Sequence, residues 1–539
     1  MRCAGWSTAR PWRAVAAWLA FVVLCVVVGA SVGTNTATTE DYRIGEAGRA
    51  ETMASAGGLP PQAVENVLVT APSSGNGPVV LARMEAAAQD VVQRMQSLPE
   101  VERVDTPRLS ADGTAMVVAV TMAGPELGAK RTVDTLLAQT AVVAAAHPDL
   151  RVEQVGAASI GKGVDRQRSD DLLRTEIVAL PVTVLVLLVV FGSLVSAIVP
   201  LLLALTAIAG AVGLSMVASH AFPDAGVGTN VILLIGLAVG VDYSLFYLER
   251  EREERDRSGG TLSDQAIVHL ATATAGRTVV VSGLAVIVSS ATLYLADDVI
   301  FSSVATGAVT VAAVAVLGAL TVLPAVAVLL GRRSVRWTPG RTGRGSLRSE
   351  PGRLTSAAMR RVSRWPAATL LLAVTALGVL ATPMVGLTIT DMGRETHSRE
   401  IPEMVSYDRL NDAFPDLTAT NRVVVRDRPE RKGAVAAELD RLAVRTTGLP
   451  AGDRSRTSAD GRVTVLDLPV PHHVGSAPAH TALTQLRGQD VPRLADALPD
   501  ADIAVTGDVA RYVDYPQHQA EHLPLIIGAL LLVTFAVTA

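Results

Sequence analysis

Stretches without a charged side chain divide this chain into apolar and polar segments. A helix that crosses ~30 Å of hydrocarbon needs about 20 mostly apolar residues, and the charge-free stretches reach that length repeatedly. The stretch 177–223 is long enough for two such helices. The pattern predicts eight membrane-spanning helices, at about 12–32, 174–194, 197–219, 225–248, 277–296, 299–330, 366–386 and 522–539.

Two long polar segments, 33–173 and 387–520, follow the first and the seventh predicted span. In both segments, strand-like runs alternate with helix-like runs, as in the strand predicted at 65–70 and the helix predicted at 80–95. The order β-α-β-β-α-β predicts two α+β domains with a ferredoxin-like fold. One strand of the second segment has no clear pattern. The predicted fold class is therefore a polytopic α-helical membrane protein with two ferredoxin-like exterior domains.

The order of these segments occurs twice in the same direction. A basic stretch with Trp and Pro precedes an apolar run, a polar segment follows, and an acidic residue then begins an apolar run that contains proline. Parallel repeats of this kind are a transporter architecture. The last apolar run still continues at Ala539, so we expect a second half that is C-terminally incomplete. The predicted organisation is a first span in 1–32, exterior domains at 33–173 and 387–520, spans in 174–330, a linker at 331–365, a span at 366–386 and the start of a span at 521–539.

Arginine placement predicts the orientation. Three arginines precede the first span, and the linker 331–365 carries ten arginines against one acidic residue, Glu350. Cytoplasmic loops carry such an excess, so we expect a multi-pass protein of the plasma membrane with a cytoplasmic N-terminus. A cleavable signal peptide within 1–32 is the alternative, and the repeated order favours an uncleaved anchor.

Composition narrows the possible classes of function. Hydrophobic residues make up 49% of the 539 residues and charged residues only 18%, whereas a soluble domain averages about 25% charge. The net charge of −4 gives no basic excess for a nucleic-acid partner. The two cysteines, Cys3 and Cys25, exclude a disulfide framework and a multi-cysteine metal site. His472, His473 and Asp467 are interpreted as surface residues, because a metal site needs three or four convergent ligands, and we expect no cofactor.

The chemically informative residue is Asp242, which interrupts an otherwise uncharged span. Glu249 lies seven positions further on, so Asp242 is ~10 Å from the cytoplasmic charges at about 1.5 Å per residue. An ionised carboxylate at that depth costs about 2.5–3.5 kcal/mol on insertion scales. Burial would favour its protonation, and the adjacent Tyr243 can donate to the carboxylate or relay a proton. We therefore predict a protonation switch, Asp242 with Tyr243, that faces other helices and not lipid.

A structural role is the alternative for each residue of this candidate site. Asp242 could instead hold two spans together through a hydrogen bond. Gly236 and Gly240 have the small-xxx-small spacing that allows close helix approach, and that spacing also fits simple packing. Ser282 is a candidate hydroxyl partner on the next span, although such a serine often bonds to its own helix backbone. Three other acids, Asp224, Asp297 and Asp298, are expected in short solvated exterior loops.

The segment Gly240-Val241-Asp242-Tyr243-Ser244-Leu245-Phe246, followed by the charged run 249–254, resembles the fourth-span motif of the MmpL transporters. These form a branch of the resistance–nodulation–division superfamily found largely in actinobacteria. Phe191-Gly192-Ser193-Leu194 with Pro200, and Ala275-Gly276-Arg277-Thr278 with Ser282-Gly283, are similar to the same family.

The resemblance implies export of lipids or other hydrophobic compounds, driven by the proton-motive force, with Asp242 and Tyr243 as the proton relay. The family has a second Asp-Tyr on a tenth span, which this sequence does not contain. The implied partners are a hydrophobic substrate, protons and membrane lipids. For the missing half three alternatives are open: the chain is a fragment, the gene product is truncated, or a partner such as a second copy or another chain supplies it. A non-transporting alternative is a sterol-sensing-like receptor or a secretion accessory protein. An enzyme is not expected, because no reactive cluster is found.

Overall fold

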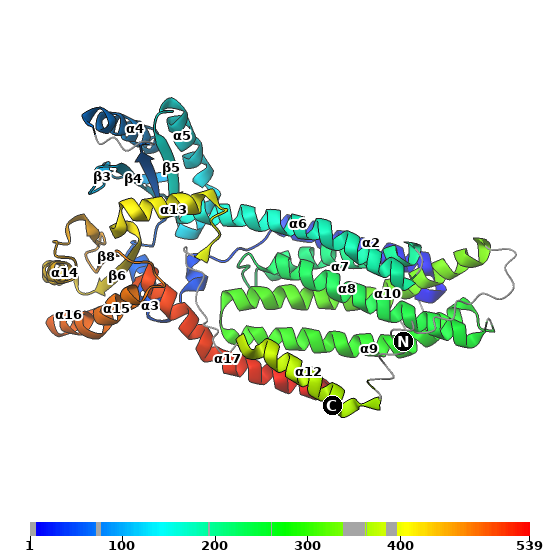
Figure 1. Ribbon diagram of the computed structural model, residues 1–539. Coiled ribbons are helices and arrows are strands. Elements are labelled where there is room, and N and C mark those ends of the chain that lie inside the picture. The colour runs from blue at the N-terminus through cyan, green and yellow to red at the C-terminus, as the bar shows by residue number, and fades with distance from the viewer. Residues whose placement is uncertain are drawn as a thin grey trace.

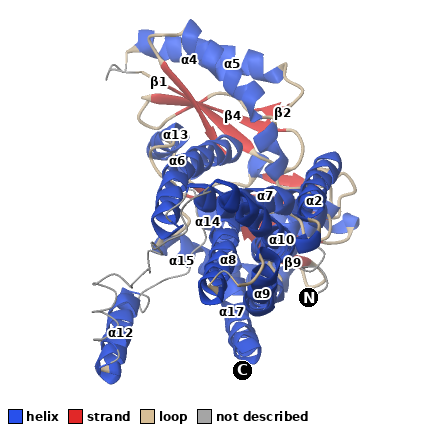
Figure 2. Ribbon diagram, turned by 90° about the vertical axis from the view of Figure 1, so that its right-hand side faces the viewer, coloured by secondary structure: helices blue, strands red, loops and turns tan. Residues whose placement is uncertain are grey.

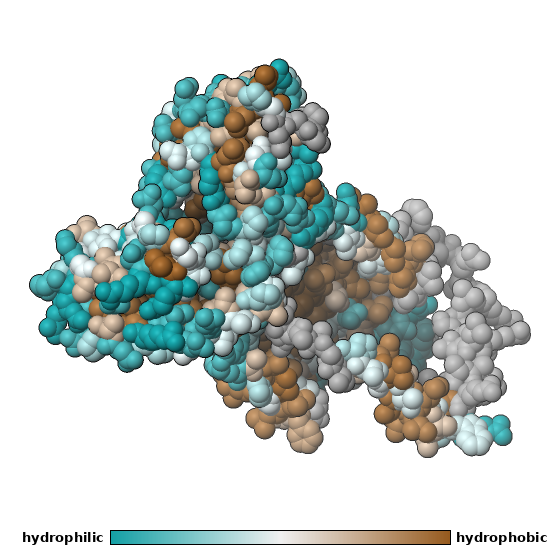
Figure 3. All heavy atoms as spheres, turned by 60° about the vertical axis from the view of Figure 1, so that its left-hand side comes forward, coloured by the Kyte–Doolittle hydropathy of each residue, from teal (hydrophilic) through white to brown (hydrophobic). Residues whose placement is uncertain are grey.

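The computed structural model describes residues 7–71, 77–191, 194–259, 261–337, 362, 364–383 and 396–538. Long helices form one end of the molecule and two α+β domains form the other (Figure 1). The α+β domains are largely hydrophilic on their surface, whereas apolar side chains cover the helices (Figure 3). This division matches the alternation of polar and charge-free segments along the chain.

The apolar segments form long helices because a helix satisfies its own backbone hydrogen bonds, as the interior of a bilayer requires. The helices α2, α7, α8, α9 and α10 share one buried apolar core, and α6 and α17 pack on its outside against α7 and α9. Helix α12 has no buried residue among those described and stands apart from the bundle (Figure 2). The bounds are Pro11–Val32 for α2, Ala157–Phe191 for α6, Leu194–Ala218 for α7, Gly228–Ser258 for α8, Asp264–Ala291 for α9, Val299–Trp337 for α10, Pro366–Ala381 for α12 and Asp508–Thr538 for α17.

Six helices of the described residues are long and apolar enough to cross a membrane, against eight predicted spans. The six lie at Pro11–Val32, Ala197–Ala218, Gly228–Ser258, Gln265–Ala296, Val299–Leu329 and Asp508–Val537. The two other predicted spans, 174–194 and 366–386, each run into residues outside the described part of the chain. Most of the predicted linker 331–365 also lies outside it, and its first residues continue α10 as far as Trp337.

Helix α2 packs as an integral member of the bundle. Trp18 is buried and its indole N–H donates to the hydroxyl of Thr206 on α7 at 3.1 Å. Gly29 meets α7 so closely that a Cβ there would lie 2.4 Å from the carbonyl oxygen of Gly213. These contacts pack α2 directly against α7.

The first α+β domain, called domain 1, extends from β1 to β5 (residues 64–156). Its antiparallel sheet has the strand order β2-β4-β1-β5, and the short β3 also pairs with β4. Helices α4 and α5 cover one face of the sheet through an apolar core that includes Val67, Met84 and Leu136. The bounds are Val64–Thr70 for β1, Pro78–Gln96 for α4, Val101–Val104 for β2, Arg108–Leu109 for β3, Ala115–Met122 for β4, Val133–Ala146 for α5 and Arg151–Gly156 for β5. A short 3₁₀ helix, η2 (Glu126–Arg131), leads into α5.

Domain 2 repeats this arrangement with the strand order β7-β8-β6-β9, again antiparallel. Helices α14, α15 and α16 cover one face through a core that includes Val423, Leu439 and Leu466. The strand without a clear sequence pattern is β7, which has only three residues. The bounds are Ala419–Arg426 for β6, Lys432–Thr447 for α14, Ser455–Thr457 for β7, Val463–Val470 for β8, Ala477–Gln485 for α15, Val491–Ala497 for α16 and Asp502–Gly507 for β9.

The two domains exchange a helix. Helix α3 (Gly45–Ala56) follows the first span, yet it covers the open face of the domain 2 sheet, where Met53 packs with Val424. Helix α13 (Pro402–Ala413) lies in the second half of the chain and covers the open face of domain 1, where Tyr407 packs with Val117. Figure 1 shows α13 beside β5 and α3 beside domain 2. Each sheet is therefore completed by the other half of the chain.

Of the three acidic residues predicted in solvated exterior loops, Asp297 is exposed as predicted, but the other two are bound to the protein. Asp298 is buried, and its Oδ1 accepts from the backbone N–H groups of Ile300 and Phe301 at the start of α10. Asp224 accepts from the hydroxyl of Ser303 at 2.6 Å. A carboxylate that caps a helix in this way satisfies backbone donors that the helix itself leaves unpaired.

Candidate functional site

Asp242 lies near the middle of α8, on the stripe of that helix left uncovered by its neighbours. The exposed side chains Leu234, Ala238, Asp242 and Phe246 follow one another at intervals of four residues, and therefore lie on one face. Among the described residues, the Asp242 carboxylate has no hydrogen-bond partner. The prediction that this side chain faces other helices of the described chain is wrong. The reason is that α7, α9 and α10 pack on the other faces of α8.

The small residues of α8 explain which faces are covered. A Cβ at Gly236 would lie 2.5 Å from Cγ1 of Ile208 on α7 and 2.8 Å from Cγ2 of Val311 on α10. A Cβ at Gly240 would lie 2.8 Å from that of Ala204. Both glycines are buried, so they allow the close helix approach that their spacing suggests. They support the site through packing and do not reach the carboxylate.

Tyr243 connects α8 with α9. Its ring is half-buried, and its hydroxyl lies near the side chain of Ser282 on α9. The Ser282 hydroxyl donates to the carbonyl oxygen of Val279 on its own helix at 3.4 Å, which is the alternative considered for this serine. A Cβ at Gly283 would lie 2.2 Å from Cγ2 of Val316, so glycine at this position allows α10 to approach α9 closely, and the Tyr243 hydroxyl oxygen lies 3.4 Å from the same point. The structure therefore brings Tyr243 and Ser282 close to each other, while Asp242, which precedes Tyr243 in the sequence, is hydrogen-bonded to neither.

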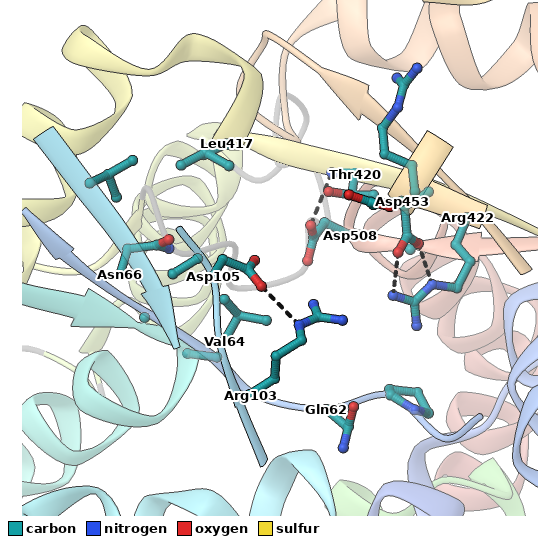
Figure 4. A pocket seen from close by; sticks show the side chains of 18 of the residues that line it. Gln62, Val64, Asn66, Arg103, Asp105, Leu417, Thr420, Arg422, Asp453 and Asp508 are labelled. Carbon is teal, nitrogen blue, oxygen red and sulfur yellow. Dashed lines mark hydrogen bonds and ion pairs between the residues drawn. The ribbon is translucent and has the colours of Figure 1, made fainter. Parts of the chain in front are cut away.

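A second candidate site is a cavity of about 1100 Å³ between the two α+β domains. Figure 4 shows Val64, Asn66 and Leu417 on one side, Arg422 and Asp508 on the other, and Arg103 between them. Domain 1 and α13 contribute apolar side chains, among them Val64 and Leu410, but also Arg103 and Arg108. Domain 2 contributes further arginines, among them Arg422 and Arg456. The cavity is accordingly amphipathic.

Ion pairs hold the arginine side chains of the cavity in place. Arg422 on β6 binds both carboxylate oxygens of Asp467 on β8, the residue opposite it in the sheet register. Burial alone would lower the pKa of the Arg422 guanidinium, but Asp467 holds that pKa above its ordinary value. Asp467 is thus part of an ion pair that lines a cavity, and its interpretation as a simple surface residue is wrong. His472 and His473 are exposed.

The model of one protein family, the MMPL family, matches residues 61–369, more than half of the chain. The chain belongs to the MMPL family. The resemblance of the Asp242 motif to MmpL transporters is thereby confirmed at the level of the family. MMPL proteins are transporters and not enzymes, so this member is a multi-pass membrane protein of a transporter family.

Relatives of this MMPL protein carry different names. A putative membrane protein of Streptomyces coelicolor is 30% identical over 559 residues, which cover 99% of this chain and 72% of the relative. The mycolic acid-containing lipids exporter MmpL11 of Mycolicibacterium smegmatis is 34% identical over 44% of the chain and 24% of the relative. The heme uptake protein MmpL11 of Mycobacterium tuberculosis is 29% identical over 72% of the chain and 40% of the relative. The chain therefore spans less than half of either mycobacterial relative.

Sequence reasoning located the Asp242 motif of this MMPL chain but not its cavity. The arginines of the cavity come from strands far apart in the sequence, such as β2 and β7. Each arginine taken alone looks like an ordinary surface residue of a strand. The one available signal was Arg422 directly before the apolar run 423–425 of β6, where a charge needs a partner.

Proposed function

We propose that this protein exports a lipid or another hydrophobic compound across the plasma membrane, driven by the proton-motive force, with Asp242 and Tyr243 as the proton relay. The observation that carries the proposal is an ionisable residue in the middle of a transmembrane helix of an MMPL protein. Such residues mark proton or substrate pathways by default, because an ionised carboxylate there costs about 2.5–3.5 kcal/mol. The name of the M. smegmatis relative, a lipid exporter, supports a lipid as the cargo.

The exposed face of α8 that contains Asp242 affects how the proposed proton relay would work. Leu234, Ala238 and Phe246 suit contact with lipid or with another helix, but an ionised Asp242 does not suit lipid contact. We therefore propose that further transmembrane helices, outside the described residues, cover this stripe. Protonation of Asp242 would remove the charge from that contact and allow the helices to shift. Each elementary charge that crosses the membrane contributes ~2.3 kcal/mol per 100 mV to such a cycle.

Tyr243 and Ser282 would pass the change from α8 to α9. Because α10 packs against both α8 and α9, a shift of α8 would also displace α9 and α10. Helices α6 and α17 run directly from β5 and β9 into the membrane, so they would carry the movement into the α+β domains. The finer features of the predicted fold, eight spans and two ferredoxin-like domains arranged as a parallel repeat, belong to this proposal. The antiparallel β-α-β-β-α-β order of both sheets supports them.

The test is complementation of a deletion strain of the native host. Lipids and other hydrophobic compounds outside the plasma membrane are quantified by mass spectrometry in strains that carry the wild type, Asp242→Asn or Asp256→Asn. Asp256 is an exposed residue near the end of the same helix and serves as the matched control. We expect the wild type and Asp256→Asn to restore the exported compound, Asp242→Asn to fail at equal membrane abundance, and a protonophore to abolish export. Restoration by Asp242→Asn, or a deletion that changes no exported compound, would refute the proposal.

The competing function is a sterol-sensing-like receptor or a secretion accessory protein. In that case Asp242 would have a structural role, and the deletion phenotype would be rescued in the presence of the protonophore. The same strains therefore separate the two functions.

A further inference from the structure

A small cavity of about 30 Å³ lies at the end of the helical bundle from which the chain continues into domain 1. Its lining comes from the last turns of α7, the following loop 219–227, the start of α8 and the first turns of α10. Thr34 and Thr229 belong to the lining and are exposed, so an occupant can enter from solvent. A cavity of this size holds one water molecule or one dehydrated ion, and the surrounding oxygen atoms decide between them.

Asp224 supplies the charge of this cavity. Its Oδ1 accepts from the hydroxyl of Ser303 at 2.6 Å and from the backbone N–H groups of Gly226 and Gly228 at 3.1 and 3.3 Å. Its Oδ2 accepts no hydrogen bond from a described residue, and no described Lys or Arg forms an ion pair with the carboxylate. The carboxylate therefore has neutral partners at one oxygen and can bind a cation with the other.

The negative charge of Asp224 also acts on its surroundings. Burial, and then three carboxylates, raise the pKa of Tyr42 to about 12: Asp298, Asp224 and Asp41. Two basic side chains reach the same region, but Arg131 donates to a threonine hydroxyl at 3.3 Å and the exposed His220 contacts a backbone carbonyl oxygen at 3.2 Å. The electrostatic surroundings of the cavity therefore favour a cation.

Three buried hydroxyl groups line the cavity together with the carboxylate, those of Ser219, Ser303 and Thr306. Each already donates its one proton, Ser303 to Asp224 and the other two to backbone carbonyl oxygens. A hydroxyl oxygen has two lone pairs, and Ser219 and Thr306 each use one of them for a further partner. Toward an occupant of the cavity, all three groups can therefore act only as acceptors or as ligands.

Gly228 leaves room at the point where these oxygen atoms converge. A Cβ at this position would lie 3.0 Å from Oδ1 of Asp224, 3.3 Å from the hydroxyl oxygen of Ser303 and 3.4 Å from the carbonyl oxygen of Ser303. A water molecule in the cavity would find acceptors for its protons but no donor among the buried hydroxyl groups. A cation is attracted by every one of these oxygen atoms.

The number of charged ligands selects the kind of cation. Ca²⁺ is bound through several carboxylates, and Mg²⁺ usually keeps several waters, whereas this cavity has one carboxylate and a volume for one particle. Among the described residues, no three His, Cys, Asp or Glu side chains form a group that could hold a metal ion. A monovalent ion would leave the site neutral, and of the two common monovalent ions Na⁺ is smaller than K⁺.

We propose that this cavity binds one Na⁺, with Asp224, Ser303 and Thr306 as its ligands. The bound ion would neutralise the carboxylate and fasten the loop 219–227 to α10. Because the ion binds only the folded chain, it would also stabilise the fold. The inference does not rest on the proposed proton relay, since Asp242 lies fourteen residues beyond Gly228 on α8, ~21 Å away at about 1.5 Å per residue.

The test is equilibrium binding of radioactive Na⁺ to the purified full chain in a neutral detergent, with choline chloride keeping the ionic strength constant. We expect saturable binding of one Na⁺ per chain. Unlabelled Na⁺ should displace the label, and K⁺ should be about tenfold less effective or worse. A lack of saturable binding would show that the cavity holds only water, and equal displacement by K⁺ would remove the selection by size. Either result overturns the proposal.

Two variants separate charge from space. Asp224→Asn keeps an oxygen acceptor for the backbone N–H groups but removes the charge, and should raise the dissociation constant of Na⁺ about tenfold or more. Gly228→Ala keeps the charge but places a methyl group where the oxygen atoms converge, and should weaken binding as strongly. Asp297→Asn is the matched control, because Asp297 is an exposed acid in another loop at the same end of the bundle and does not line the cavity. Its φ of 49° is one that asparagine adopts readily.

Thermal unfolding gives the second readout. The midpoint of the wild type, followed by circular dichroism, should rise with Na⁺ concentration more than with K⁺ at equal ionic strength. This difference should disappear in Asp224→Asn and Gly228→Ala and persist in Asp297→Asn. Size-exclusion chromatography establishes that each variant is folded. Unchanged Na⁺ binding in folded Asp224→Asn, or equal midpoints of the wild type in Na⁺ and K⁺, would contradict the site. Neither assay contains a pH gradient, so the outcome is independent of export.

Discussion

The ion pair that holds the exchanged helix α3 can be tested by Arg511→Met. Arg511, near the start of α17, pairs with Glu51 on α3 and with Glu126 of η2 in domain 1, and so joins three parts of the chain. The Glu51 side chain is only 5% exposed, and without Arg511 its carboxylate would keep only the hydroxyl of Thr506, at 2.9 Å. An uncompensated buried charge of this kind is strongly destabilising.

The magnitude follows from the burial of the two partners. Removing one partner of a fully buried pair costs about 3–5 kcal/mol. Arg511 is itself 35% exposed, so solvent screening reduces the expected cost to about 2–3 kcal/mol. Helix α3 keeps a second anchor, because Arg487 pairs with Glu46 at 2.9 Å. The loss should therefore appear as more frequent local opening of α3, and not as unfolding of the whole protein.

Hydrogen–deuterium exchange of the full chain in detergent measures this opening directly. A cost of about 2–3 kcal/mol predicts exchange roughly 30- to 150-fold faster in peptides that cover Gly45–Ala56. Arg441→Met is the control, because its pair with Glu438 is on one helix and Arg441 is 67% exposed. Adding Glu51→Gln to Arg511→Met should recover much of the protection, since it removes the unpaired charge. Exchange of α3 in Arg511→Met that stays within twofold of the control would refute the reasoning.

Two further predictions concern a buried acid and a close helix contact. Burial raises the pKa of Glu65 above its ordinary value, although its carboxylate accepts from Gln154 and from backbone N–H groups at the start of α6. The folded state therefore holds a proton that the unfolded state releases, so this group's contribution to stability falls as pH rises from about 4.3 toward the raised pKa. Glu65→Gln should make thermal stability less dependent on pH across that window, and an unchanged pH profile would contradict the assignment. Gly240→Val should destabilise the bundle by about 1–3 kcal/mol through overpacking against Ala204, measured as denaturant-induced loss of helicity, whereas Gly378→Val, in open space on α12, should not.

Local patterns in the sequence were sufficient for the elements themselves. The strand predicted at 65–70 corresponds to β1, Val64–Thr70, and the helix predicted at 80–95 to α4, Pro78–Gln96, because alternation and helical periodicity are local properties. The three-residue strand β7 gave no pattern because it is too short to alternate visibly. The two spans missing from the six candidates were predicted from apolar runs that extend beyond the described residues.

Contacts between distant segments could not be predicted in the same way. Helix α3 has 12 residues and only a weak apolar face, and nothing in its sequence says which of the two similar sheets it covers. The Arg422–Asp467 pair depends on the register of β6 against β8, and the exposed position of Asp242 depends on which faces of α8 its neighbours occupy. Asp298 was predicted to be a solvated loop residue. The sequence alone does not show that its carboxylate accepts from backbone N–H groups at the start of the following helix, α10.

The central claim is that Asp242 gains and loses a proton within the membrane, and infrared difference spectroscopy tests it most directly. The full chain is reconstituted in lipid bilayers and titrated from neutral to acidic pH. We predict a protonated-carboxyl C=O band that grows toward low pH in the wild type and in Asp256→Asn and is absent from Asp242→Asn. Identical difference spectra for the wild type and Asp242→Asn would contradict the account.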